Sequence, residues 1–167
     1  MTLNQYIENI NKRYKLGNAT EHSFRGDLQQ LIESINPEIS ATNEPKRQSC
    51  GAPDYILTKK DTSTGSAGVP VGFIEAKDIG DRDLEGLKKT GNKEQFDRYK
   101  ASLNNLIFTD YLTFILYREG EFVSRISIGE ITASPNPSKG GALEIRPLPE
   151  NFSAFENFIK DFCTHIG

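Results

Sequence analysis

The sequence predicts a single α/β domain in which a central mixed β-sheet is flanked by helices. Apolar residues recur at three- and four-residue steps in residues 3–16 and 21–35, which is typical of amphipathic helices. Short apolar segments with strand character follow between residues 53 and 128, and a Phe-rich amphipathic stretch lies at 152–162. We therefore expect one domain over residues 1–167, with its core at about 20–130.

The net charge limits what the chain can bind through charge alone. Its 167 residues include 20 Lys and Arg and 23 Asp and Glu, which gives a net charge of −3 with both His neutral. A domain that holds nucleic acid by charge alone carries an excess of basic residues instead. If phosphate groups are the target, a metal ion or a neighbouring domain has to help. No apolar run reaches the length of a membrane span and the first residues do not form a signal peptide, so we expect a cytoplasmic protein with no membrane partner.

Two helices are expected before the first strand. The first covers residues 3–16 and ends at the Gly-Asn pair 17–18. Thr20 is the expected N-cap of the second helix, which runs over residues 21–35 and ends at the Asn-Pro pair 36–37.

The rest of the chain is expected to contain several short strands and two more helices. Turn-rich loops are expected at residues 61–68, 78–92 and 133–142, and a hairpin turn at 118–121. The expected helices are 93–103 and 152–162, and the expected strands are 53–59, 69–77, 106–109, 112–117, 122–128 and a short edge strand at 143–147.

Three charged residues are predicted to meet at one end of a hairpin formed by residues 53–59 and 69–77. Paired residues of an antiparallel hairpin have a constant index sum, and Asp54 and Glu75 sum to 129. The turn is then centred between residues 64 and 65, inside the polar loop. Residues two apart on a strand point to the same face, so Lys77 accompanies Glu75.

Two carboxylates and an ammonium group suit the metal-assisted hydrolysis of a phosphodiester. Carboxylate oxygens are ligands that Mg²⁺ prefers, and bound Mg²⁺ acidifies water and neutralises charge on a phosphoryl oxygen. Lys77 would orient the attacking water or stabilise the developing charge. An acid-x-Lys triplet also arises by chance about once in a chain of this length, and residues 44–46 are a second match. A polar strand end that faces solvent is therefore the alternative explanation.

Further residues are candidates for supporting roles. Gln95 and Tyr99 lie one helical turn apart and share a face, with Phe96 beneath them. They would hydrogen-bond to DNA, to a catalytic water or to the carboxylates, whereas the alternative is a Tyr99 that only covers the core. Glu21, in the first turn of its expected helix, is either an ordinary capping residue or part of the metal site.

These residues resemble the motif of the PD-(D/E)XK nuclease superfamily. Asp54 followed by Glu75-x-Lys77 looks like its acidic and lysine motif, and Gln95-Phe96-x-x-Tyr99 is similar to an element of its RecB-type and restriction-endonuclease branches. The helix with Glu21 ahead of the Asp54 strand matches as well. Over roughly residues 20–125, the order of elements most resembles the N-terminal endonuclease domain of single-chain restriction-modification enzymes of types IIG and ISP.

The resemblance implies a restriction-endonuclease-like core and a Mg²⁺-dependent deoxyribonuclease, with Mn²⁺ as a substitute, that cleaves double-stranded DNA. It implies that Asp54 and Glu75 are catalytic metal ligands, with Glu21 as an accessory acid in the metal site. It also implies that Lys77 and Gln95 act in catalysis and that Tyr99 supports them.

The resemblance further implies that the chain is a fragment of a larger restriction-modification protein with covalently linked methyltransferase and target-recognition domains. A dimer is expected during cleavage, because cutting two strands needs two sites. Two alternatives stay open. One is a RecB-type repair nuclease or exonuclease, which shares every site residue, and the other is a catalytically inactive DNA-docking module of the same fold.

Overall fold

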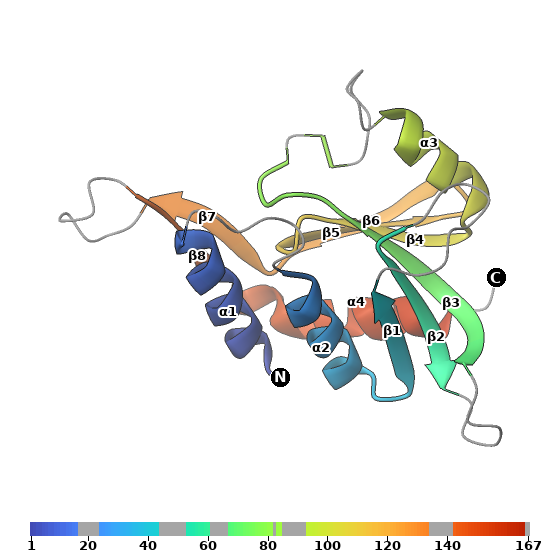
Figure 1. The fold of residues 1–167 in the computed structure, drawn as a ribbon, viewed down its shortest axis with the longest axis horizontal. Coiled ribbons are helices and arrows are strands. Elements are labelled where there is room, and N and C mark those ends of the chain that lie inside the picture. Colours follow the sequence, from blue (N-terminus) through green and yellow to red (C-terminus); the bar gives the residue numbers. More distant parts are fainter. Residues whose placement is uncertain are drawn as a thin grey trace.

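A mixed six-stranded sheet with the strand order β1-β2-β3-β4-β5-β6 lies at the centre of the molecule (Figure 1). The computed structural model describes residues 1–16, 24–43, 53–60, 67–81, 83–84, 93–133 and 142–165. Strands β3 and β4 are parallel, and the other neighbouring pairs of this sheet are antiparallel. The predicted mixed sheet is therefore confirmed.

The described elements follow the expected order, with two additional strands. The helices are α1 (Leu3–Lys15), α2 (Arg25–Ile35), α3 (Lys93–Ser102) and α4 (Phe152–Thr164), and a 3₁₀ turn covers Pro149–Asn151. The strands of the main sheet are β1 (Ile39–Asn43), β2 (Tyr55–Lys60), β3 (Ala67–Ala76), β4 (Asn105–Thr109), β5 (Thr113–Arg118) and β6 (Glu121–Ser127). Strands β7 (Gly129–Ala133) and β8 (Leu143–Pro147) form a separate antiparallel pair.

Helices cover both faces of the main sheet, and the buried apolar residues that the structure describes form one cluster on each face. Helices α1, α2 and α4 lie on one side of the sheet and α3 lies on the other (Figure 1). Successive strand residues point to opposite faces. Ile74 and Ile107 therefore pack into the cluster with α1, α2 and α4, whereas Phe73 and Phe108 pack into the smaller cluster with Phe96 of α3.

The second helix begins later than expected. Helix α2 begins at Arg25 instead of residue 21, and Phe24 is its N-cap residue, without a side-chain cap hydrogen bond. Phe24 is buried and its ring lies 5.3 Å from that of Tyr111, so packing of this side chain accompanies the observed start of the helix. Thr20, the expected N-cap, and Glu21 lie outside the described residues.

Strands β1 and β7 were not expected. Strand β1 has the sequence ISATN, with only two buried apolar residues, and it pairs with the outer side of β2. Strand β7 pairs with β8, which is the edge strand expected at residues 143–147. The turn between β5 and β6 is confirmed, and Glu119 and Gly120 adopt the positive φ angles of 50° and 79° that a tight hairpin turn requires.

Asn105 joins the end of α4 to the sheet. Its side chain is buried, and its amide donates hydrogen bonds to the carbonyl oxygens of Val71 and Phe162, each at 2.8 Å. Because both carbonyl groups would lose their partner, we expect Asn105→Ala to lower the free energy of unfolding by about 2–4 kcal/mol.

Urea denaturation measures this loss of stability. Asn104→Ala is the matched control, because Asn104 is the preceding residue and its side chain is exposed. Equal denaturation midpoints for the two variants would show that Asn105 does not hold α4 against the sheet.

Candidate active site

The register of β2 and β3 places Asp54 opposite Glu75. Tyr55 pairs with Ile74 and Ile56 pairs with Phe73, and both pairs keep the predicted index sum of 129. The register shifts only beyond Leu57, farther from the site. The predicted convergence is therefore confirmed at this end of the hairpin, whereas the predicted turn lies outside the described residues.

Two reciprocal hydrogen bonds hold the carboxylates together. The backbone N–H of Asp54 donates to Glu75 Oε1 at 3.2 Å, and the backbone N–H of Ala76 donates to Asp54 Oδ2 at 2.8 Å. The side chain of Glu75 is only 4% exposed and that of Asp54 is 14% exposed. Each carboxylate is thus fixed by the backbone of the opposite chain segment.

Burial next to a second acid favours a proton on Glu75. Burial, followed by the hydrogen bond and the negative charge of the Asp54 side chain, raises the pKa of Glu75 to about 9, although Lys77 and the backbone N–H of Asp54 act in the opposite direction. At neutral pH and without a cation, Glu75 therefore holds a proton at its contact with Asp54.

Lys77 continues the cluster toward α3. Its backbone N–H donates to the carbonyl oxygen of Thr109 at 2.8 Å, so the neighbouring strand β4 positions the residue. Its Nζ lies 3.8 Å from Glu75 Oε2 and 5.3 Å from the centroid of the Phe96 ring. The ammonium group is therefore held between a carboxyl group and an aromatic face.

Gln95 and Tyr99 extend from Lys77 as a hydrogen-bonded chain. Lys77 Nζ donates to Gln95 Oε1 at 3.2 Å, and Gln95 Nε2 donates to the Tyr99 hydroxyl at 3.2 Å. The predicted shared face of Gln95 and Tyr99 is confirmed. Tyr99 is also almost fully buried, so it covers the core in addition to accepting this hydrogen bond.

Arg25 is a member of the cluster that the sequence analysis did not identify. Its Nη2 lies 2.5 Å from Asp54 Oδ1, and its side chain is only 10% exposed. The Tyr55 hydroxyl donates to the Arg25 carbonyl oxygen at 2.8 Å and so fixes the start of α2. The available signal was helical spacing, because Arg25 lies three and seven residues before the buried Leu28 and Ile32.

Asp54 and Glu75 are the residues that could hold a divalent cation. Glu21, the third expected ligand, lies outside the described residues, and the residues that the structure describes contain no cluster of three acidic, His or Cys ligands. A buried pair of carboxyl groups in contact suits Mg²⁺, which binds through one or two carboxylates and keeps several water ligands. A divalent cation at this place would favour the charged form of Glu75, which burial and the neighbouring Asp54 disfavour.

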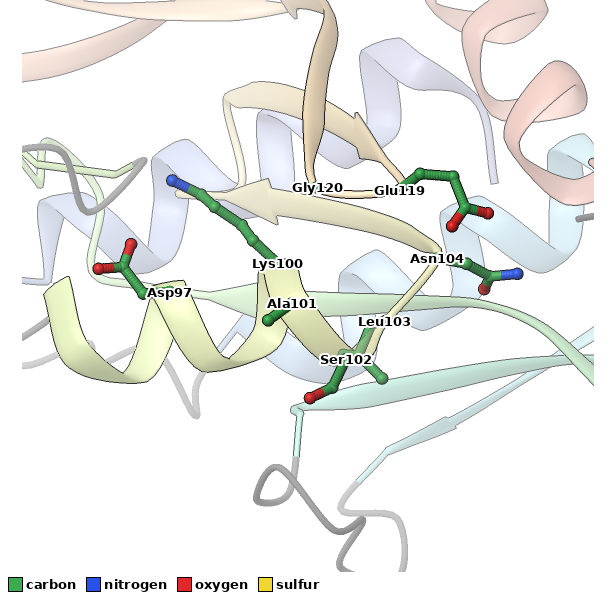
Figure 2. Close-up of a pocket in the computed structure, with 8 residues that line it drawn as sticks. All are labelled: Asp97, Lys100, Ala101, Ser102, Leu103, Asn104, Glu119 and Gly120. Carbon is green, nitrogen blue, oxygen red and sulfur yellow. The ribbon is translucent and has the colours of Figure 1, made fainter.

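A cavity of about 450 Å³ lies away from this cluster, at the C-terminal half of α3 (Figure 2). None of the predicted site residues lines it. Figure 2 shows Asp97 and Lys100 on α3 and Glu119 at the turn between β5 and β6. The carboxylate cluster is therefore a separate feature of the sheet end and does not depend on this cavity.

The comparisons with known proteins identify a shared fold. No family model and no curated protein matches the sequence. Among solved structures, the chain is similar to a chain of the cryo-EM structure of a DrdV–DNA complex, with a TM-score of 0.60 and 17% sequence identity. The match covers 99% of this chain but only 14% of that chain, so this chain spans a small part of its length.

The predicted fold class is confirmed by this likeness and by the observed sheet. It is an α/β fold in which helices flank a mixed sheet, with a restriction-endonuclease-like core. Within the described ranges, no helix has both the length and the apolar character that crossing a membrane requires.

The protonation of Glu75 predicts a specific dependence of stability on pH. The folded protein keeps the Glu75 proton up to a pKa of about 9, whereas the unfolded chain releases it near 4.5. Between these values the folded state binds more protons, so the stabilising contribution is complete below the lower value and is lost as pH rises. In EDTA, we expect the free energy of unfolding to fall with pH by up to about 1.4 kcal/mol per pH unit from this group.

Urea denaturation between pH 5 and 9 checks this dependence. Glu75→Gln removes the titrating group and should flatten the profile, whereas Glu156→Gln, at an exposed position of α4, should leave the profile unchanged. Parallel profiles for the wild type and Glu75→Gln would contradict a proton held on Glu75.

Proposed function

We propose that the chain is a metal-dependent nuclease domain that hydrolyses phosphodiester bonds of double-stranded DNA, with a site of the PD-(D/E)XK type. The observation that carries this proposal is the convergence of Asp54, Glu75 and Lys77 at one end of the β2–β3 hairpin. Asp54 directly precedes β2, whereas Glu75 and Lys77 lie at the end of β3. Backbone hydrogen bonds hold the two segments together at this point.

In this proposal, Asp54 and Glu75 hold Mg²⁺, for which Mn²⁺ can substitute. To act as a ligand, Glu75 would have to be in its deprotonated form, with its proton released to solvent. When bound, the cation supplies a more acidic water and neutralises charge on the phosphoryl oxygen. Glu21 is proposed as an accessory acid of this metal site.

Lys77 and Gln95 act on the reacting groups in this proposal. Lys77 carries a positive charge beside the carboxylates and would orient the attacking water or stabilise the charge that develops on the phosphate. Gln95 accepts a hydrogen bond from Lys77, so it restricts the ammonium group to one direction. Tyr99 in turn accepts from Gln95 and fixes the amide orientation.

Double-stranded DNA is the proposed partner. Support comes from the fold, since the similar chain was solved in a DrdV–DNA complex. A net charge of −3 suits a domain whose cation acts at the scissile phosphate while other domains contribute to DNA affinity. We further propose that the domain belongs to a larger cytoplasmic restriction-modification protein, in which it is covalently linked to methyltransferase and target-recognition domains, and that two copies meet during cleavage.

DNA cleavage by the full-length protein in Mg²⁺ tests the proposal. We expect Asp54→Asn and Lys77→Met each to lower the cleavage rate by about 10²-fold or more, because each removes a charge from the reacting centre. Asp161→Asn and Lys160→Met are matched controls with the same chemical changes at exposed positions of α4, and they should cleave like the wild type.

Circular and linear DNA substrates distinguish an endonuclease from an exonuclease. Cleavage of closed circular DNA supports an endonuclease, whereas cleavage only of linear DNA supports the RecB-type exonuclease. Equal cleavage rates for the wild type, Asp54→Asn and Lys77→Met would show that this cluster is not the catalytic site. A wild type that binds DNA but neither cleaves it nor binds Mn²⁺ would favour the inactive docking module.

A further inference from the structure

Arg25 is a buried cation at the carboxylate cluster that the proposed hydrolysis does not use. Its side chain is 10% exposed, and its guanidinium contacts Asp54 Oδ1 at 2.5 Å. A charge-assisted hydrogen bond between a guanidinium and a carboxylate is among the stronger side-chain interactions. The Tyr55 hydroxyl holds the Arg25 backbone from the adjoining strand, so the contact is part of the folded core.

The contact with Arg25 occupies one of the two carboxylate oxygens that a cation at Asp54 could use. Asp54 Oδ2 accepts a hydrogen bond from the backbone N–H of Ala76, whereas Oδ1 accepts from the guanidinium of Arg25. Arg25 occupies this oxygen. A divalent cation shared by Asp54 and Glu75 would therefore approach the guanidinium closely.

The charges make such an approach unfavourable. A divalent cation adds net positive charge to the cluster even when its binding displaces one proton. Arg25 and Lys77 already place two positive charges beside the two carboxyl groups. Like charges a few ångströms apart in a partly buried site repel strongly, so the cation and the guanidinium compete for Asp54.

We propose that Arg25 is a positioning residue that occupies Asp54 Oδ1 in the cation-free protein and gives up this contact when a divalent cation binds. Without a metal, the guanidinium holds the Asp54 carboxylate in one orientation and balances its negative charge. It also lowers the affinity of the site for the cation. This inference rests on the metal site of the proposed function.

The pair of Arg13 and Asp27 provides an internal comparison. Arg13 Nε lies 2.8 Å from Asp27 Oδ2, and the Asp27 side chain is as well buried as the site carboxylates, at 6% exposed. This pair joins α1 to α2 and does not include a proposed metal ligand. The Arg13 side chain is 48% exposed, so its loss removes a more solvent-exposed arginine–aspartate pair without changing the charge at the cluster.

The affinity for Mn²⁺, measured by isothermal titration calorimetry on the full-length protein, tests the exchange. We expect Arg25→Gln to lower the Kd by about tenfold, the order expected when one unit charge is removed a few ångströms from the cation. Arg25→Lys keeps the charge and should restore the affinity to near that of the wild type. Arg13→Gln should leave the Kd unchanged. A purely structural role for Arg25 predicts weaker binding instead.

A second measurement needs no variant and covers the case in which Arg25→Gln does not fold. The NMR signal of the Arg25 side-chain Nε–H group reports its environment in the wild type. During a titration with diamagnetic Mg²⁺, we expect this signal to shift as the guanidinium leaves Asp54, whereas the Arg13 signal should stay in place.

Each outcome decides a different claim. An unchanged or higher Kd for Arg25→Gln, or an Arg25 signal that Mg²⁺ does not move, overturns the exchange. If the wild type still binds Mn²⁺ and Asp54→Asn does not, the metal site itself survives that result. A wild type that binds no Mn²⁺ overturns both the proposed metal site and the exchange.

Discussion

The hydrogen bonds that cross between Asp54 and the Glu75–Ala76 segment are the constraint on which the site depends. They are made by backbone N–H groups, so their positions are set by the pairing of β2 with β3 and not by side-chain rotamers alone. A slip of one residue would turn Glu75 to the opposite face of the sheet. The apolar core resists such a slip, because Ile74 would have to leave the cluster beneath α2 and α4.

The same geometry brings the carboxyl groups of Asp54 and Glu75 together, and two features of the folded protein limit the repulsion between them. Two carboxyl groups lie in contact with little exposure to solvent, and such a pair cannot easily carry two negative charges. A proton on Glu75 removes one charge, and Arg25 compensates Asp54. Both proposals rest on the geometry of this cluster, in which Arg25 contacts the same carboxylate that the β2–β3 pairing holds beside Glu75.

Local pattern predicted much of the fold and the convergence at the site. Pairing Asp54 with Glu75 gave an index sum of 129 and a turn inside the polar loop, and the pairing of Tyr55 with Ile74 confirms this sum. Helical spacing likewise placed Gln95 and Tyr99 on one face. The metal and catalytic roles of these residues stay predictions, and so does the role of Glu21.

Features that depend on distant partners could not be predicted in this way. Strand β1 is short and largely polar, and it forms because β2 presents an unpaired edge beside it. The register shifts beyond Leu57 depend on local backbone geometry that a constant index sum does not include. Helical spacing could show that Arg25 is buried, but only the fold shows that its partner is Asp54, 29 residues later.

The location of bound Mn²⁺ tests the central claim most directly. A crystal structure of the full-length protein grown with Mn²⁺, with anomalous diffraction recorded, should show a peak within bonding distance of carboxylate oxygens of both Asp54 and Glu75. A peak elsewhere, or an empty site in which the two carboxyl groups still contact each other, would contradict a cation centre built by the β2–β3 register.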